Sequence, residues 1–196
     1  MTSPARAASA RTPRTSTRAA GSSSSSSFAS LGVAPEMVSS LAAGGITAPF
    51  PIQAATLPDS LAGRDLLGRG RTGSGKTVAF ALPLVSALSG RRSSARRPRG
   101  LVLVPTRELA VQVDQTIAPL AAAMGLRTRT IFGGVGQNPQ VQALAKGVDI
   151  IVATPGRLAD LIKQGHANLG AIEVTVIDEA DHMADLGFLP EVRRLL

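Results

Sequence analysis

The stretch Gly70 to Thr77, Gly-Arg-Thr-Gly-Ser-Gly-Lys-Thr, has the pattern of a glycine, any four residues and then Gly-Lys-Thr. This pattern is typical of loops whose backbone N–H groups hold phosphate oxygens. The short apolar stretch at residues 65–68 precedes it, and the apolar run from Val78 to Leu88 follows it. The sequence therefore predicts a strand, a phosphate-binding loop and a helix, in that order.

Each residue type in this stretch has a use in binding a nucleotide. Glycines allow the backbone to curl around phosphate oxygens, and the start of the next helix points its positive end at them. Lys76 adds a mobile positive charge, and the hydroxyl of Thr77 suits Mg²⁺. A glycine-rich turn that matches by chance is the alternative interpretation. The predicted nucleotide-binding residues are Gly70, Arg71, Thr72, Gly73, Ser74, Gly75, Lys76 and Thr77.

Composition limits the class of protein. The 196 residues, 44% of them hydrophobic, allow one ordinary domain and a tail. The absence of cysteine excludes disulfides, thiolate zinc sites and a cysteine nucleophile. No apolar run approaches the roughly 18 residues that a membrane span needs, so we expect no membrane association. The net charge of +8 favours an anionic partner such as nucleic acid, although a solvated basic surface is an equally ordinary explanation.

Residues 1–27 differ from the rest of the chain. They contain four arginines, no acidic residue, 13 serines and threonines, and a run of six serines. With almost nothing apolar to bury, this segment is predicted to be a disordered basic tail. An organelle transit peptide has a similar composition. We favour the plain tail and hence a cytoplasmic protein, with organelle import as the alternative.

Beyond residue 27, candidate strands alternate with candidate helices. Strands are expected at residues 101–104, 128–132, 150–153 and 174–177. Helices are expected to end near residue 45 and to cover residues 52–61, 78–88, 106–124, 138–147 and 154–164. Thr106 and Thr154 are expected to cap the helices that they begin. Residues 89–100, with five arginines, are expected to form a solvated surface loop. The alternation predicts an α/β fold, a doubly wound and mostly parallel sheet with helices on both faces.

Polar clusters follow the predicted strands, and in such sheets ligands gather at the carboxyl ends of the strands. After the last strand, Asp178, Glu179 and Asp181 place three carboxylates within four residues. Their mutual repulsion is relieved if Mg²⁺ is bound together with ATP. We expect Asp178 and Thr77 to hold the metal, and Lys76, Asp178 and Glu179 to be catalytic, with Glu179 activating the attacking water. A solvated turn at the strand end is the alternative.

The residues Asp178-Glu179-Ala180-Asp181 spell the motif of the DEAD-box RNA helicases, and the chain resembles that family from Phe28 to Leu196. The resemblance implies a RecA-like phosphate-loop NTPase domain and an enzyme that couples ATP binding and hydrolysis to RNA unwinding or ribonucleoprotein remodelling. It also implies that Phe28 stacks on adenine and that Gln53 hydrogen-bonds the edge of the base. Phe50 departs from the family, which commonly has a small hydroxyl residue there, and Gly70 stands where alanine is common.

The resemblance further implies a surface that grips one RNA strand by its sugar-phosphate backbone, without reading base sequence. The residues concerned are Pro105, Thr106, Arg107, Gly133, Gly134, Thr154, Pro155, Gly156 and Arg157. His166 and His182 have no second histidine at ligand spacing, so no transition-metal site is expected. Protein partners are not indicated.

By the same resemblance, residues 28–196 are expected to be the first ATP-binding domain, incomplete at its carboxyl end and without the second RecA-like domain. One strand should then be missing between residues 65–68 and residues 174–177. The alternative function is an ATP- and RNA-binding half without productive helicase activity. An ATPase that acts on DNA or protein is a third possibility.

Overall fold

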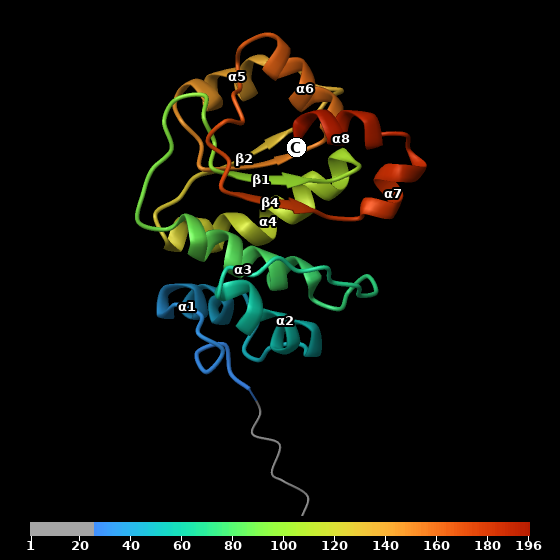
Figure 1. The fold of residues 1–196 in the computed structure, drawn as a ribbon. Helices are drawn as coiled ribbons and strands as arrows, with labels where there is room; N and C mark the ends of the chain where they lie inside the picture. Colours follow the sequence, from blue (N-terminus) through green and yellow to red (C-terminus); the bar gives the residue numbers. More distant parts are fainter. Residues whose placement is uncertain (1–25) are drawn as a thin grey trace, which may run out of the picture.

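In the computed structural model, which describes residues 26–196, helices and strands alternate along the chain (Figure 1). The predicted tail of residues 1–27 therefore lies almost wholly outside the described residues. The strands are β1 (Gly100–Leu103), β2 (Thr128–Ile131), β3 (Ile150–Ala153) and β4 (Val174–Ile177). The helices are α1 (Pro35–Ala43), α2 (Pro51–Leu61), α3 (Lys76–Leu88), α4 (Arg107–Ala123), α5 (Asn138–Ala145), α6 (Pro155–Lys163), α7 (Ala180–Asp185) and α8 (Leu189–Leu195).

The four strands form one parallel sheet in the order β2-β3-β1-β4. The central strand β1 pairs with β3 and β4, so that Leu101 lies level with Ile151 and Thr175. All residues of β1 and β3 are buried, as expected for strands covered on both faces. The predicted α/β class with a parallel sheet is confirmed.

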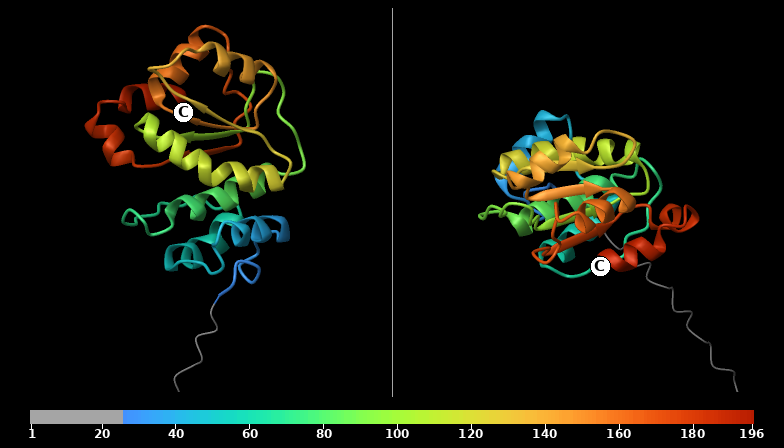
Figure 2. Two further views of the ribbon diagram at one scale, coloured as in Figure 1. Left: turned by 180° about the vertical axis from the view of Figure 1, so that it is seen from behind. Right: turned by 90° about the horizontal axis from the view of Figure 1, so that it is seen from above.

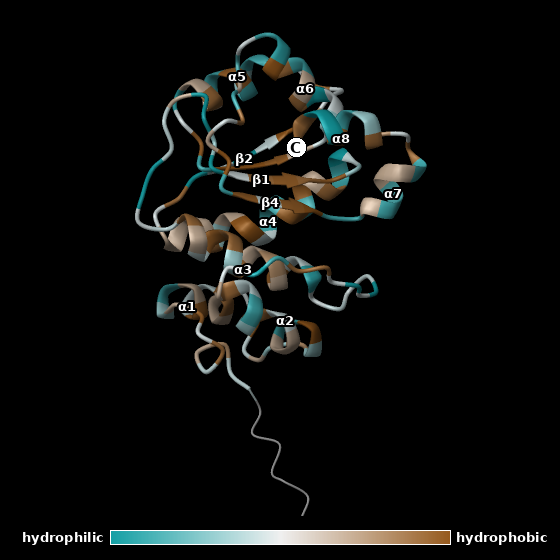
Figure 3. Cartoon of the chain, viewed as in Figure 1, coloured by the Kyte–Doolittle hydropathy of each residue, from teal (hydrophilic) through white to brown (hydrophobic). Residues whose placement is uncertain are grey.

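Helices cover both faces of the sheet because successive strand residues point to opposite sides. Val102 and Val152 pack with residues of α1, α3 and α4, whereas Leu101, Leu103 and Ile151 pack with residues of α5, α6 and α8. Figure 1 and Figure 2 show these two helix layers, with α1 and α2 beyond α3. In Figure 3, β1 is mainly hydrophobic, while β2, at the edge of the sheet, carries hydrophilic residues.

The helix that follows the phosphate-binding loop continues through Pro83. Proline removes one backbone hydrogen bond from a helix. Here Leu82 and Leu84 on either side are at most 1% exposed. Their burial supplies stabilisation that an isolated helix with this sequence would lack.

The strand predicted at residues 65–68 does not form, and this prediction was wrong. Residues 64–70, all within the described part of the chain, belong to no helix or strand, and Leu67 is 91% exposed. A groove of about 380 Å³ separates this segment from the free edge of β4. A strand requires a hydrogen-bonding neighbour, and the groove denies one to residues 65–68. The groove lies where the family resemblance implied a missing strand.

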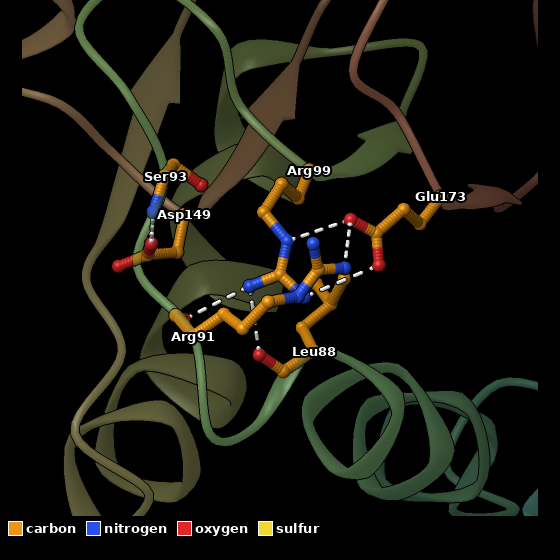
Figure 4. Close-up of polar contacts among 6 residues, drawn as sticks. All are labelled: Leu88, Arg91, Ser93, Arg99, Asp149 and Glu173. Atoms are coloured by element: carbon orange, nitrogen blue, oxygen red, sulfur yellow. Dashed lines mark hydrogen bonds and ion pairs between the residues drawn. The ribbon is translucent and has the colours of Figure 1, made fainter.

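At the amino ends of the strands, Arg99 forms a buried clamp (Figure 4). Its Nε lies 2.7 Å from Glu173 Oε1 and its Nη2 lies 3.2 Å from Glu173 Oε2. Its Nη1 donates to the backbone carbonyls of Leu88, at 3.0 Å, and Arg91, at 2.9 Å. Arg99 is only 5% exposed. The arginine-rich loop is therefore held against the sheet by its last arginine, and the prediction of a fully solvated loop was wrong at this residue.

Asp149 is the second anchor at this end of the sheet (Figure 4). Its buried carboxylate accepts hydrogen bonds from the backbone N–H groups of Ser93, at 2.6 Å, and Arg127, at 2.8 Å. Burial alone would raise the pKa of Asp149. These hydrogen bonds and the charge of Arg92 outweigh burial, and the pKa lies below its ordinary value.

We predict that Asp149→Asn lowers the free energy of unfolding at pH 7 by about 1–3 kcal/mol, because the new amide group would face a backbone N–H. Since folding lowers the pKa of Asp149, its contribution is complete above about pH 5 and is lost as the pH falls through its folded pKa. The difference between the two proteins should therefore shrink below about pH 4 in urea-unfolding measurements.

The matched control is Asp59→Asn. Asp59 pairs with Arg64 on the surface, where both side chains are about half exposed or more. This change should alter stability by about 0.5 kcal/mol or less. Equal effects of the two substitutions would contradict a special role for Asp149.

Candidate nucleotide and nucleic-acid site

The parallel register brings the polar clusters to one edge of the sheet. Pro105 follows β1, Gly133 follows β2, Thr154 follows β3 and Asp178 follows β4. Because all four strands run the same way and are in register, these residues lie at the same edge. This arrangement agrees with the sequence-based expectation that the chemistry gathers at the carboxyl ends.

A pocket of about 750 Å³ opens at this edge, beside the phosphate-binding loop. Segments that are far apart in the sequence line it together. Its lining residues are Gly45, Ile46, Thr47, Ala48, Phe50, Gln53, Thr72, Gly73, Gly75, Lys76, Thr77, Val78, Leu109, Gln112, Val113, Asp178, Glu179 and His182. This volume is in the usual range for small-molecule sites.

The phosphate-binding loop turns sharply before α3. Gly73 and Gly75 have φ of 81° and 87°, a left-handed conformation that favours glycine. A side chain at Gly75 would also lack space, since a Cβ there would lie 2.5 Å from Gln53 Nε2 and 2.6 Å from Phe50 Cδ2. Gly75 immediately precedes α3, whose first residue is Lys76. The N-terminus of that helix therefore faces the pocket, as phosphate binding requires.

Gln53 connects the loop to α2. Its Nε2 donates to the carbonyl of Gly75 at 3.0 Å, and its Oε1 accepts from the backbone N–H of Phe50 at 2.9 Å. Gln53 is 1% exposed. In this conformation its amide supports the loop from behind, and the edge-reading role implied by the resemblance stays a prediction.

Gly70 lies where the loop is tightly packed. A Cβ there would lie 2.6 Å from Ser74 Oγ and 3.2 Å from Lys76 Cγ. The hydroxyl of Ser74 is buried and has no hydrogen-bond partner within residues 26–196. The glycine that replaces the common alanine is thus compatible with this loop conformation. Gly70, Arg71 and Ser74 do not line the pocket, in contrast to the other predicted residues of the loop.

Lys76 and Glu179, predicted separately as catalytic residues, are in direct contact. Lys76 Nζ lies 2.9 Å from Glu179 Oε1. Glu179 adopts a left-handed backbone conformation, with φ of 51°, which is uncommon for a residue with a side chain. Its N–H donates to Asp178 Oδ1 at 3.1 Å. The phosphate-binding loop and the acidic motif therefore form one site.

Asp178 lies in an environment that suits a cation. Burial raises the pKa of Asp178, and the adjacent Glu179 carboxylate raises it further, while Lys76 acts in the opposite direction. Within residues 26–196 no group of three or more His, Asp or Glu side chains could hold a metal. Asp178 and Thr77 nevertheless line the same pocket, which fits Mg²⁺ because this ion is usually held by one or two protein groups together with phosphates and water.

The two aromatic residues near the predicted adenine site differ in position. Phe28 is 2% exposed and packs in the hydrophobic core, and it does not line the pocket. Phe50 is 53% exposed and does line it. In the sequence, Phe50 stands out only as a departure from the family. Gln112 of α4 also lines the pocket and was not predicted, because the repeat of apolar residues in that helix indicates only a buried face.

The predicted RNA-binding residues meet around the loop that follows β2. Both Nη1 and Nη2 of Arg157 donate to the carbonyl of Val135, each at 3.2 Å. A Cβ at Gly134 would lie 3.6 Å from Arg107 Nη1. Thr106 caps α4 by accepting from the N–H of Leu109 at 3.2 Å, as predicted. The structure thus brings Arg107, Gly134 and Arg157 together on one surface.

Two of the predicted RNA-binding residues, Pro105 and Pro155, are buried in the protein. Pro105 is buried at the end of β1, and Pro155 is buried in the first turn of α6. Thr154 occupies the N-cap position of α6 but forms no side-chain cap hydrogen bond, so its predicted capping role was wrong. The exposed residues Gly134 and Gly156 leave the backbone of this surface accessible.

Comparison with known proteins agrees with this geometry. Residues 50–196 match the family model described as "DEAD/DEAH box helicase". The chain belongs to the DEAD/DEAH box helicase family. It is 46% identical over 172 residues to the ATP-dependent RNA helicases RhlB of Shigella dysenteriae serotype 1 and Escherichia coli O157:H7. The match covers 86% of this chain and 41% of each relative.

A solved helicase structure has the same fold. The RNA helicase Prp28 from Chaetomium thermophilum, bound to ADP, superposes with a TM-score of 0.79 at 38% identity, over 85% of this chain and 41% of that one. The RecA-like fold expected from the DEAD-box resemblance is confirmed. The chain spans about two fifths of the length of these relatives.

The helices of the described region differ from membrane-spanning helices. None in residues 26–196 has both the length and the apolar character needed to cross a bilayer.

We predict that Gly75→Ala weakens nucleotide binding by about tenfold or more, because the added methyl group forces the loop away from Gln53 and Phe50 and strains the backbone. Titration with a fluorescent ATP analogue would measure the change. Gly136→Ala is the matched control, since a Cβ there meets nothing within 4 Å. Equal affinities of the two variants would show that the conformation of Gly75 is not required.

Proposed function

We propose that this protein is an ATP-dependent RNA helicase, in which ATP binding and hydrolysis drive local RNA unwinding or ribonucleoprotein remodelling. The observation that carries the proposal is the contact between Lys76 and Glu179, 2.9 Å apart across 103 positions of sequence. It places the phosphate-binding loop and the acidic motif in one pocket of a size suited to a nucleotide. Membership of the helicase family and similarity to ATP-dependent RNA helicases support the same function.

The relatives are named as helicases, which favours an enzyme over a binding half without productive activity. We further propose that residues 28–196 act as the ATP-binding domain, and that the whole enzyme uses a second domain of the same class. This domain arrangement rests on the resemblance and on the share of the relatives that the chain spans.

In the proposed reaction, each residue acts on a different part of ATP. The N–H groups at the start of α3 and the ammonium of Lys76 bind phosphate oxygens and offset the charge that develops on the transferred group. Glu179 orients the attacking water and accepts its proton. We propose that Thr77 and Asp178 hold Mg²⁺, which when bound neutralises phosphate charge.

The contact between Lys76 and Glu179 suggests how nucleotide binding prepares the site. Both side chains are partly exposed, at 23% and 35%, so phosphate can compete with the carboxylate for Lys76. When phosphate takes over Lys76, the carboxylate of Glu179 is freed to receive a proton from water. We therefore expect that binding of the triphosphate frees Glu179 to act as the general base.

We predict that Glu179→Gln keeps the affinity for ATP within about threefold while lowering RNA-stimulated turnover by about 100-fold or more, since the amide cannot accept the proton. Equilibrium titration and phosphate release would measure these two quantities. Undiminished turnover would remove Glu179 from the mechanism. Absence of RNA-stimulated turnover in the unchanged enzyme would contradict the proposed activity itself.

We propose RNA as the nucleic-acid partner, bound through its backbone. The surface formed by Arg107, Gly134 and Arg157 offers guanidinium groups and accessible backbone, which suit phosphate and sugar oxygens and carry no base sequence. The binding should therefore depend on salt and be nearly independent of sequence. An ATPase that acts on DNA or protein remains the competing function.

Arg107→Ala should weaken binding of single-stranded RNAs of different sequence by the same factor and reduce the slope of log affinity against log salt by about 0.7. Fluorescence anisotropy at several salt concentrations would measure both. The control is Arg194→Ala on α8, whose side chain is 79% exposed and lies in no predicted RNA element. A loss confined to one RNA sequence, or stronger binding of DNA than of RNA in competition, would contradict the proposal.

For location, we propose the cytoplasm. This proposal rests on the composition of residues 1–27, which favours a plain basic tail over a transit peptide; import into an organelle is the alternative. The residues that bear on import are 1–27, and import of a fusion carrying residues 1–30 would distinguish the two.

A further inference from the structure

Phe50 occupies a position where an aromatic residue is unusual. It is the N-cap of α2, a place that favours Ser, Thr, Asp and Asn because their side chains accept a hydrogen bond from the helix. Phenylalanine has no acceptor and gives up that stabilisation. At 53% exposure its ring also remains in contact with solvent. The ring also lines the pocket beside the phosphate-binding loop, and small-molecule pockets are lined mainly by hydrophobic and aromatic side chains.

The surroundings of Phe50 fix its ring beside the phosphate-binding loop. Its N–H is held by Gln53 Oε1 at 2.9 Å, and the same amide holds the carbonyl of Gly75 at 3.0 Å. The ring atom Cδ2 lies 2.6 Å from where a Cβ of Gly75 would be. The ring therefore packs against the backbone of Gly75 on one side and borders the pocket on the other.

Phe50 is also the only Phe, Tyr or Trp among the described residues that line this pocket. Phe28, the aromatic residue implied by the resemblance, is buried in the core at 2% exposure. Gln53 is buried, and Oε1 and Nε2 of its amide each form one hydrogen bond within the chain. The open part of the Phe50 ring therefore offers a planar base a surface on which to stack in this pocket.

We propose that Phe50 is the residue that binds the nucleobase of ATP, by stacking. This rests on the proposed function, because it assigns a further contact in the same pocket. Stacking reads the face of a base and not its edge, so it contributes similarly for every base. Phe50 should therefore strengthen binding of ATP and GTP alike, while contributing nothing to a ligand without a base.

Phe50→Thr tests this, because threonine removes the ring and is a favourable N-cap residue, so α2 is expected to fold. The ligands are ATP, GTP and inorganic tripolyphosphate, each with Mg²⁺, and the dissociation constants are measured by calorimetry. We expect affinities for ATP and GTP to fall by the same factor, about 5- to 150-fold, and the affinity for tripolyphosphate to stay within about twofold. Phe50→Tyr should keep all three affinities within about threefold of those of the unchanged protein.

Leu67→Thr is the matched control, because Leu67 is a large apolar residue, 91% exposed, that does not line the pocket. It should change none of the affinities, and melting curves of all variants should confirm that they fold. An equal loss for tripolyphosphate would overturn the inference, since the ring would then act only by supporting Gly75. Unchanged ATP binding in Phe50→Thr would overturn it as well. Absence of ATP binding by the unchanged protein would overturn both this inference and the proposed function.

Discussion

Parallel pairing of four strands in register is the constraint on which the site depends. Every strand begins at one edge of the sheet and ends at the other, so the turns that follow β1, β2, β3 and β4 must lie side by side. Polar residues far apart in sequence thereby share one surface. The contact between Lys76 and Glu179 lies at the carboxyl ends of the strands, and so does the pocket beside it. The loop that follows β2, which Arg107 and Arg157 flank in space, lies there as well.

The charged residues at the amino ends of the strands differ in their surroundings from those at the carboxyl ends. At the amino ends, Asp149 and Arg99 are buried, and their polar atoms are bound to backbone groups and to Glu173. Satisfied buried charges of this kind hold a structure in place. At the carboxyl ends, Lys76, Asp178 and Glu179 are only partly buried and balance one another incompletely. In the proposed function, a nucleotide bound with its metal ion relieves that imbalance.

Contacts with α2 hold the phosphate-binding loop in its conformation. Gln53 in α2 accepts from the N–H of Phe50 and donates to the carbonyl of Gly75, so hydrogen bonds join the loop to the start of α2 and the pocket wall. The replacement of a small hydroxyl residue by Phe50 gives up a helix cap and adds an aromatic surface at the pocket. The proposed role of Phe50 thus follows from the same two hydrogen bonds that fix the loop.

Local pattern alone was sufficient for much of the fold. Alternating apolar strands and amphipathic helices predicted the parallel sheet, and Thr106 with the residues after it predicted the start of α4. These features depend on neighbours along the chain, which the sequence shows directly. The glycine pattern of residues 70–77 and the carboxylates of residues 178–181 indicated the two halves of the nucleotide site for the same reason.

Contacts between distant segments were decided only by the tertiary structure. The apolar stretch at residues 65–68 has the composition of a strand, but a strand forms only where a neighbouring strand offers hydrogen bonds. Here a groove separates residues 65–68 from β4. The burial of Arg99 and Phe28 and the exposure of Phe50 likewise depend on what packs around each side chain. The sequence by itself thus determined the order of the elements and the chemistry at their ends. Which of those residues reach the pocket depended on packing between segments that the sequence does not place next to each other.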